Sequence, residues 1–252
     1  MGEQTVIETR DLTKIYNGQV AVNRLNLHVR EGEIFGFLGP NGAGKTTTML
    51  MLLGLSEPTS GEAAVCGFNP NREPFQVKKL VGYLPENVGF YDDLTAAENL
   101  RFISRLNGLP DKQAMSRIRD LLRLVELLGE ESKPVGHYSR GMRQRLGIAE
   151  VLIKEPRIVF LDEPTLGLDP DGTNAMLGII RRLSEEQKIT IFFSSHLLDQ
   201  VQRISSRIGI MIKANLVAEG RIEDLAREKL GIDQERYSLE EIYMKYFKEG
   251  QA

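Results

Sequence analysis

The sequence has 252 residues, of which 41% are hydrophobic and 27% are charged, and its formal net charge is −3. These values are typical of a globular protein with a large core, and they exclude a disordered chain, a collagen-like fibre and a small disulfide scaffold. The charge balance gives no sign of nucleic-acid binding, for which a strongly basic domain is expected. The longest apolar runs, Met49–Leu53 and Ile189–Phe193, are far shorter than the ~20 residues that a membrane-spanning helix needs.

The start of the chain and its cysteine content bear on the compartment. The first ten residues, MGEQTVIETR, are polar and lack the apolar core of a secretory signal peptide. Cys66 is the single cysteine, so the chain cannot form an internal disulfide, and a reducing compartment fits. We therefore expect a cytosolic protein, unless a partner holds it at a membrane.

The first third of the chain alternates short apolar runs with turns. This pattern predicts strands at residues 6–9, 25–29, 34–38, 62–66 and 81–84. A helix is predicted from Thr46 to about Gly54, directly after a glycine-rich turn.

From Glu86 to about Lys154 the pattern changes to that of amphipathic helices. Thr95 and Glu98 have the spacing of a capping box, and residues 115–128 form a second helical stretch. The β/α alternation then returns. We expect strands at 157–161 and 189–193, a helix after Asp169 and Pro170, and a final hairpin at 208–212 and 216–219. The prediction is an α/β core interrupted by a helical insert.

The tail contains one more predicted helix. Ser238 and Glu241 have capping-box spacing. The apolar residues that follow recur with helical spacing along one face: Leu239, Ile242, Tyr243, Tyr246 and Phe247. Two interpretations stay open, because this face can pack on the chain's own core or cover a partner subunit.

The glycine-rich turn carries the first functional motif. Residues 39–46 read GPNGAGKT and fit G-x-x-x-x-G-K-[ST] between a predicted strand and a predicted helix. Its glycines let backbone N–H groups turn toward phosphate oxygens, and the helix N-terminus adds partial positive charge. Lys45 is expected to reach the β- and γ-phosphates, and the Thr46 hydroxyl to bind Mg²⁺. The other candidate ATP-binding residues here are Asn41, Gly42, Gly44 and Thr47.

A second motif follows the strand predicted at 157–161. Asp162 comes at the end of this apolar run, where a carboxylate can hold Mg²⁺ directly or through water. Glu163 comes next and can act as the general base for an attacking water. Two acidic residues in a surface loop are the alternative. Together with the first motif, they indicate a P-loop nucleoside-triphosphatase.

Further segments make the chain resemble the nucleotide-binding subunit of ATP-binding cassette (ABC) transporters, over about residues 4–220. Residues 138–142 read YSRGM where the family has its L-S-G-G-Q signature, and RQRL follows. Residues 166–169 read LGLD, which is similar to the family's D-loop. His196 matches the family's switch histidine, and Tyr16 matches the aromatic residue that stacks on adenine.

The resemblance implies a fold and a division of the chain. The expected fold is a P-loop NTPase (RecA-like) α/β core with an antiparallel β subdomain and an inserted α-helical signature subdomain. Residues 1–86 and 151–218 would form the core with its β subdomain, 87–150 the helical subdomain, and 219–252 a helical tail.

The resemblance also implies an ATP site shared between two chains. Ser139 and Gly141 lie at a predicted helix start, where an anion can bind, and in the family this anion is the γ-phosphate held by the other subunit. Two copies arranged head to tail, as a homodimer, would then complete two sites. His196 would contact the γ-phosphate, although a histidine in this position can simply cap a helix or lie in the core. Asp169 can act across the dimer, cap the next helix, or both. Tyr16 can stack on adenine or pack on the core.

The chain departs from the family's pattern at two places. Arg140 and Met142 replace the glycine and glutamine of the signature, while Ser139 and Gly141 are kept. Glu86 stands where the family has a glutamine that binds the metal and its water. Its carboxylate can also bind Mg²⁺, or it can pair with a basic residue of the insert.

The function implied is that of an ATP-hydrolysing subunit, with ATP and Mg²⁺ as cofactors, that powers transport through separate integral membrane permease subunits. It would lie at the inner face of the cell membrane and bind no nucleic acid. The general pattern resembles the subunits of ABC-2 exporters. One alternative is a soluble ABC ATPase that acts on the ribosome or DNA, and another is a regulatory subunit that senses ATP without hydrolysing it.

Overall fold

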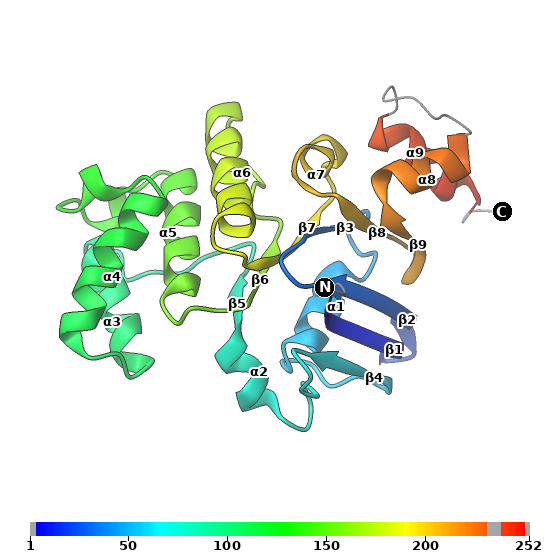
Figure 1. Ribbon diagram of the computed structural model, residues 1–252, viewed down its shortest axis with the longest axis horizontal. Helices are drawn as coiled ribbons and strands as arrows, with labels where there is room; N and C mark the ends of the chain where they lie inside the picture. The colour runs from blue at the N-terminus through cyan, green and yellow to red at the C-terminus, as the bar shows by residue number, and fades with distance from the viewer. Residues whose placement is uncertain (1–3, 231–237, 250–252) are drawn as a thin grey trace.

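The computed structural model describes residues 4–230 and 238–249, and within them a six-stranded, mostly parallel sheet forms the centre (Figure 1). Its strand order is β5-β6-β7-β3-β8-β9. The strands are β3 (Ile34–Leu38), β5 (Val81–Leu84), β6 (Ile158–Asp162), β7 (Thr190–Ser195), β8 (Arg207–Ile212) and β9 (Asn215–Arg221). Only β9 runs antiparallel to its neighbour in this sheet. Every residue of β3, β6 and β7 is buried, because layers cover both faces, and the sequence there is continuously apolar.

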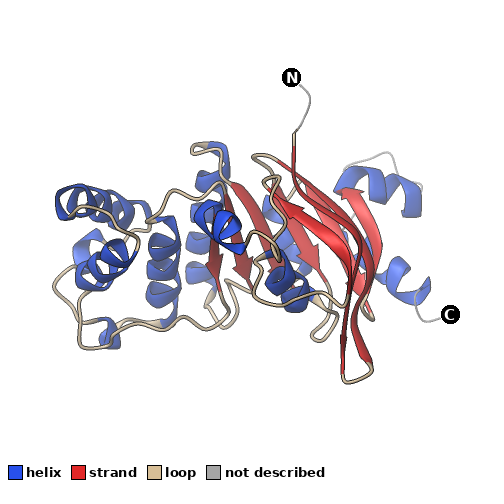
Figure 2. Cartoon of the chain, turned by 90° about the horizontal axis from the view of Figure 1, so that it is seen from below, coloured by secondary structure: helices blue, strands red, loops and turns tan. Residues whose placement is uncertain are grey.

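A second, antiparallel sheet packs against one face of the central sheet (Figure 2). It contains β1 (Thr5–Tyr16), β2 (Gln19–Arg30) and β4 (Ser60–Val65), in the order β2-β1-β4. Helix α1 (Lys45–Leu52) contributes Met49 and Leu52 to the core between the two sheets. The fold class predicted from the sequence, a mixed α/β core with an antiparallel β subdomain, is confirmed.

Strands β1 and β2 are much longer than predicted, at 12 residues each. Their pairing register shifts between Thr9 and Leu12. Asp11 and Arg24 take positive φ values of 46° and 44°. Such bulges break the alternation of apolar and polar residues, so the sequence pattern indicates only the regular part of each strand.

Helices cover the other face of the central sheet and continue beyond its β5 edge (Figure 1). They are α3 (Ala96–Leu106), α4 (Asp111–Leu124), α5 (Arg140–Leu152), α6 (Pro170–Glu185) and α7 (Leu198–Ile204). The predicted capping box is present, because Thr95 and Glu98 each accept the other's backbone N–H. Helix α4 begins and ends earlier than predicted. It ends before Glu126, because this residue takes a left-handed φ of 58° that a right-handed helix cannot contain.

Helices α2 (Pro74–Leu80) and α7 were not predicted from the sequence. Each has seven residues. Seven residues span about two helical turns, which is too short for a periodic apolar pattern to be recognised. Helix α5, by contrast, begins after Ser139 as expected.

The tail folds into α8 (Ile222–Leu230) and α9 (Leu239–Glu249). The second predicted capping box is present: Ser238 Oγ accepts from Glu241 N at 3.2 Å, and the Glu241 carboxylate accepts from Ser238 N at 3.0 Å. Leu239 and Ile242 are fully buried in the main core cluster. The apolar face of α9 therefore packs on the chain's own core, the first of the two interpretations.

Of the helices in the described residues, none combines the length and apolar character needed to cross a bilayer. The domain boundaries stay a prediction. Two of them, 150/151 and 218/219, fall inside α5 and β9. We propose that the helical insert ends with α5 at Leu152.

Candidate nucleotide site

The candidate residues of the first two motifs meet at one edge of the central sheet. Strands β6, β7 and β3 are parallel neighbours, so their carboxyl ends lie together. The phosphate loop, residues 39–44, follows β3, Asp162 ends β6, and His196 follows β7. Ligands of open α/β sheets bind outside the carboxyl ends of the strands.

The shape of the phosphate loop depends on its glycines. Gly44 caps α1 with a φ of 106°, and a Cβ atom there would overlap the backbone oxygen of Ala21. Only glycine combines this conformation with this close approach. Gly42 also has a positive φ, of 79°, but a Cβ there would meet nothing within 4 Å, so this side of the loop is open. Asn41 is likewise exposed, and Thr47 is half-buried on α1.

Lys45, the first residue of α1, is buried, with 6% of its surface exposed. Its Nζ donates to Gly39 O at 2.7 Å and lies 3.3 Å from Glu163 Oε1. A buried ammonium group needs such partners, because its hydration has been lost. Lys45 therefore connects the phosphate loop to Glu163.

Thr46 and Asp162 place two oxygen atoms side by side. Thr46 Oγ1 donates to Asp162 Oδ2 at 2.8 Å, and Ser194 Oγ donates to Asp162 Oδ1 at 2.6 Å. Mg²⁺ prefers oxygen ligands and is usually held by one or two protein groups, waters and substrate phosphates. A hydroxyl and a carboxylate next to a phosphate loop fit such an ion.

Glu163 has an unusual backbone, and its carboxylate lies between two basic side chains. Its φ is 49°, a region that non-glycine residues rarely adopt and that often marks functional sites. Its Oε2 shares a hydrogen bond with His196 Nδ1 at 2.9 Å. Its backbone N–H donates to Ser194 Oγ at 3.1 Å. The carboxylate is thus held between Lys45, whose Nζ lies 3.3 Å from Oε1, and His196.

Negative charge is concentrated at this edge. Burial, together with the nearby Asp162 charge, raises the pKa of Tyr83 to about 12. Glu86 follows β5, which pairs with β6 through Leu84 and Leu161, so it leaves the sheet at the same edge. The Glu86 side chain is exposed, and within the described part of the chain it has no hydrogen bond or ion pair. The alternative raised above, pairing with a basic residue of the insert, is therefore not seen among the described residues.

Tyr16 lies at the end of β1, with 45% of its surface exposed. Its hydroxyl shares a hydrogen bond with Ser56 Oγ at 3.1 Å, and Lys14 Nζ lies 4.7 Å from the ring centroid. The ring is not packed in the core, which removes the alternative raised above. Stacking on adenine stays a prediction.

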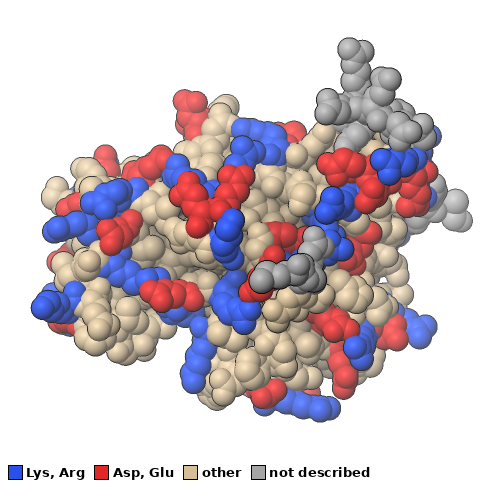
Figure 3. All heavy atoms as spheres, in the orientation of Figure 1, with Lys and Arg blue, Asp and Glu red and all other residues tan. Residues whose placement is uncertain are grey.

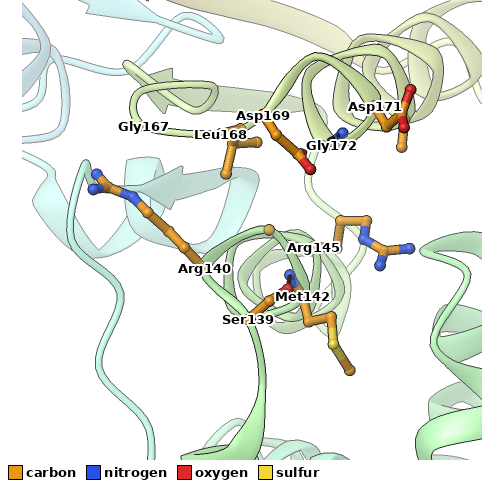
Figure 4. A pocket seen from close by; sticks show the side chains of 11 residues that line it. Ser139, Arg140, Met142, Arg145, Gly167, Leu168, Asp169, Asp171 and Gly172 are labelled. Atoms are coloured by element: carbon orange, nitrogen blue, oxygen red, sulfur yellow. Dashed lines mark hydrogen bonds between the residues drawn. The ribbon is translucent and has the colours of Figure 1, made fainter.

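The signature residues line a different pocket, of about 530 Å³ (Figure 4). Ser139 and Asp169 are N-caps of α5 and α6: Ser139 Oγ accepts from Met142 N at 3.2 Å, and Asp169 Oδ1 accepts from Gly172 N at 2.9 Å. Two helix N-termini thus border one pocket, which favours an anion there. Residues 39–47 are all described, and none of them lines this pocket.

Arg140, one of the departures from the family's pattern, extends from α5 toward the loop at Gly167 (Figure 4). A Cβ at Gly167 would lie 2.7 Å from Arg140 Nη1, so the guanidinium occupies the space that a larger residue would need. Gly167 also has a left-handed φ of 72°. Arg140 therefore packs against the D-loop rather than pointing toward Ser139.

The structure separates the candidates into two groups. One group surrounds the phosphate loop and contains Lys45, Thr46, Asp162, Glu163 and His196. The other contains Ser139, Gly141 and Asp169. Ser194, which holds Asp162 and the Glu163 backbone, was missed, because a serine in an apolar strand gives no sequence signal of its own.

Comparison with known proteins identifies the family. Residues 22–166 match the family model described as ABC transporter, which is more than half of the chain. The bacitracin transport ATP-binding protein BcrA of Bacillus licheniformis is 45% identical over 85% of this chain and 69% of the relative. The protein of the same name from Enterococcus faecalis is 43% identical over 87% of this chain and 70% of the relative.

A solved structure supports the same assignment. An ATP-binding subunit of an ABC transporter superposes with a TM-score of 0.84 at 30% identity, covering 96% of this chain and all of that one. A dimeric ATP-binding cassette bound to ADP and Pi, at 24% identity and a TM-score of 0.77, shares the fold. The chain therefore belongs to the ABC transporter family, as one of its ATP-binding and ATP-hydrolysing members.

Proposed function

We propose that the chain pairs head to tail with a second copy and that the dimer powers transport through separate membrane subunits. The observation that carries this proposal is the separation of the phosphate loop from the Ser139 pocket within one chain. A γ-phosphate bound at Lys45 needs donors on its other side, and the Ser139 pocket offers them on a different surface. A two-fold axis that brings one group opposite the other completes two ATP sites.

The phosphate loop binds the triphosphate. Its backbone N–H groups at Asn41, Gly42 and Gly44, with the N-terminus of α1 around Thr47, face the phosphate oxygens. Lys45 leaves its hydrogen bond to Gly39 O and its ion pair with Glu163, and contacts the β- and γ-phosphates instead. Thr46 and Asp162 would hold Mg²⁺, and Glu86 at the same edge would offer a further oxygen ligand. When bound, the ion neutralises charge on the β- and γ-phosphates.

Glu163 and His196 carry the hydrolytic step. When Lys45 turns to the triphosphate, Glu163 Oε1 is released and becomes free to accept a proton from the attacking water. The water oxygen forms a bond to the γ-phosphorus, and the bond to the β–γ bridging oxygen breaks, which leaves ADP and phosphate. His196 orients the water and donates to the γ-phosphate. Tyr16 stacks on adenine, and Asp169 acts across the dimer while it caps α6.

The transport role draws on the relatives, two of which are transport ATP-binding proteins. We place the dimer at the inner face of the cell membrane, bound to integral membrane permease subunits. A role on the ribosome or DNA is less well supported, since the net charge is −3 and acidic and basic side chains are interspersed over the face in Figure 3.

A mixing experiment tests the shared site. Ser139→Arg and Lys45→Ala chains are each expected to be inactive in ATP hydrolysis when alone. In a mixed dimer, the intact Lys45 of one chain meets the intact Ser139 of the other, so roughly a quarter of the wild-type rate returns if chains pair at random and sites act independently. If Ser139 served its own chain's ATP, the mixture would stay inactive, and the head-to-tail model would be wrong.

Cell fractionation tests the transport part of the proposal. We expect the chain in the membrane fraction only when an integral membrane partner is expressed with it. Recovery with ribosomes, or equal recovery in membranes with and without such a partner, would contradict the proposal.

A further inference from the structure

A buried hydrogen bond joins the two segments that carry Glu163 and His196. Thr165 Oγ1 donates to Gln200 Oε1, and the two residues are 2% and 7% exposed. Thr165 lies in the turn after β6, and Gln200 lies in the first turn of α7. Neither segment is part of the central sheet, so strand pairing alone does not fix how they lie relative to one another.

On the Glu163 side, the bond acts on a tight turn. Leu166 N donates to Glu163 O at 3.0 Å. This bond closes a β-turn with Pro164 and Thr165 at its centre. The ring of Pro164 fixes its own φ, so few backbone rotations separate Thr165 from Glu163. A hydrogen bond at Thr165 Oγ1 therefore holds the backbone from which the Glu163 carboxylate projects.

On the His196 side, the bond acts on a short helix. Helix α7 has seven residues, and no side chain of the described residues caps its N-terminus. A helix this short is not stable on its own, so its position depends on tertiary contacts. Val201 supplies one of them, because a Cβ atom at Gly36 of β3 would lie 2.3 Å from Val201 Cγ1. Gln200 supplies another, toward the turn, and it follows His196 by four residues.

Stability alone does not explain this buried polar pair. A hydrogen bond between two buried side chains replaces their bonds to water, so its net contribution to stability is modest, and two apolar groups of the same shape would serve about as well. An apolar pair would set no direction between the turn and the helix. The hydroxyl and the amide oxygen add a fixed geometry, next to a site where Glu163 Oε2 and His196 Nδ1 lie 2.9 Å apart.

We propose that Thr165 and Gln200 are positioning residues for ATP hydrolysis that hold the Glu163 carboxylate and the His196 ring together, and this rests on the roles proposed above for that pair. Ser194 Oγ accepts from Glu163 N at 3.1 Å and fixes the pair where the strands end. The Thr165–Gln200 bond fixes it beyond the strand ends. A misplacement of about 1 Å can cost roughly 10²-fold in rate. ATP binding is not affected, because the phosphate loop binds the triphosphate.

The test removes both partners together. In the double variant Thr165→Val/Gln200→Met, neither buried group is left unpaired, so the melting temperature is expected to equal that of wild type. The kcat of ATP hydrolysis is expected to fall roughly tenfold or more, while KM for ATP stays within twofold. Thr165→Ser keeps the hydroxyl and is expected to keep the wild-type kcat.

The matched control is Gln202→Met, the same substitution on the same helix. Gln202 is exposed, and its Oε1 accepts from Leu239 N of the tail at 2.8 Å rather than from the turn after Glu163. Its kcat and KM are expected to equal those of wild type.

A second measurement does not depend on turnover. The ring-nitrogen NMR resonances of the three histidines report their hydrogen bonds in the nucleotide-free chain, and the His196 signals are identified by their loss in His196→Ala. The double variant is expected to shift the His196 Nδ1 signal and to leave the signals of His28 and His137 in place.

The outcomes separate positioning from a merely structural role. A kcat within twofold of wild type in the double variant would overturn the proposal, and so would an unmoved His196 Nδ1 signal. A loss of kcat that comes with a lower melting temperature or a higher KM would show a structural role and overturn it as well. Wild-type turnover in Glu163→Gln or His196→Ala would instead overturn the proposed function, and this inference with it.

Discussion

The two groups of candidate residues differ in how completely one chain builds them. Around the phosphate loop, Lys45 and Glu163 are nearly buried, and their charged groups face one another at 3.3 Å. Around Ser139 and Asp169, the side chains are exposed, and the hydrogen bonds that they make within the described residues cap their own helices. The first group is held in place before any ligand binds, whereas the second is an open surface.

This difference follows from the elements that carry each group. Three parallel strands end at one edge and fix Asp162 and His196 by their pairing. Ser139 and Asp169 depend on two helix N-termini, which present N–H groups and partial positive charge outward. A closed group is suited to hold a nucleotide within one chain, and an open one to bind an anion brought by a second molecule. Substitutions in the first group should therefore affect the chain's own nucleotide site, and substitutions in the second group should affect the binding of an anion from a second molecule.

The largest effect is expected for Glu163→Gln. An amide cannot accept the proton of the attacking water, so turnover should fall by about 10²–10⁴-fold. ATP binding should be retained, since Lys45 is then free of its ion pair. Steady-state ATPase rates and calorimetric ATP titration check both parts. A turnover within tenfold of wild type would mean that Glu163 is not the general base.

Lys45→Ala should weaken ATP binding. The loop loses a charge-assisted contact to phosphate, for which about 1.5–3 kcal/mol is typical, or roughly 10- to 150-fold in affinity. Hydrolysis should be abolished, and the Glu163 carboxylate is left buried without its cation. Calorimetry measures the affinity, with the exposed Lys79→Ala as the control. Equal affinities for the two variants would rule out the phosphate-loop assignment.

Much of the molecule could be predicted from the sequence, because the signals involve residues that are close together in the chain. The phosphate loop is a contiguous motif between a strand and a helix, so Lys45 and Thr46 were placed correctly relative to both. Capping boxes at Thr95 and Ser238 were also found, because their partners are three residues away. The strands β3, β6 and β7 were recognised by their continuous apolar runs.

What the sequence could not predict depends on contacts between distant segments. Ser194 reaches Asp162 across 32 positions, and Gln144 reaches Glu86 across 58. A serine or glutamine has no periodic or motif signal, so only the folded chain shows its partner. The bulges of β1 and β2 were likewise hidden, since they interrupt the very alternation by which strands are recognised.

A third prediction compares one serine from each group. Ser194→Ala leaves the buried Asp162 Oδ1 without its donor, while Thr46 still donates to Oδ2, so the free energy of unfolding should fall by about 1–3 kcal/mol. Ser139→Ala removes an exposed helix cap and should lower it by only about 0.5–2 kcal/mol. Urea unfolding of both variants measures the difference. A larger loss of unfolding free energy for Ser139→Ala than for Ser194→Ala would show that the two groups do not differ in this way.

The smallest effect is expected for Glu86, which follows β5 at the same sheet edge as the phosphate-loop group but is itself exposed. If its carboxylate binds Mg²⁺ or its water, Glu86→Gln exchanges a charged oxygen ligand for a neutral one, which holds the ion less strongly. The Mg²⁺ concentration for half-maximal ATPase should then rise several-fold. ATP binding without metal should stay equal or improve, because a negative charge near the triphosphate has been removed.

The measurement is the ATPase rate against free Mg²⁺ at saturating ATP, for both proteins. A purely structural role would instead lower the melting temperature with the same Mg²⁺ requirement, which the absence of a described partner for the Glu86 side chain argues against. Superimposable Mg²⁺ curves would rule out the metal contact. The contact of Glu86 in the chain itself would then be that of its backbone oxygen, which accepts from Gln144 Nε2 of α5 at 3.0 Å, and Glu86 would not belong to the group around the phosphate loop.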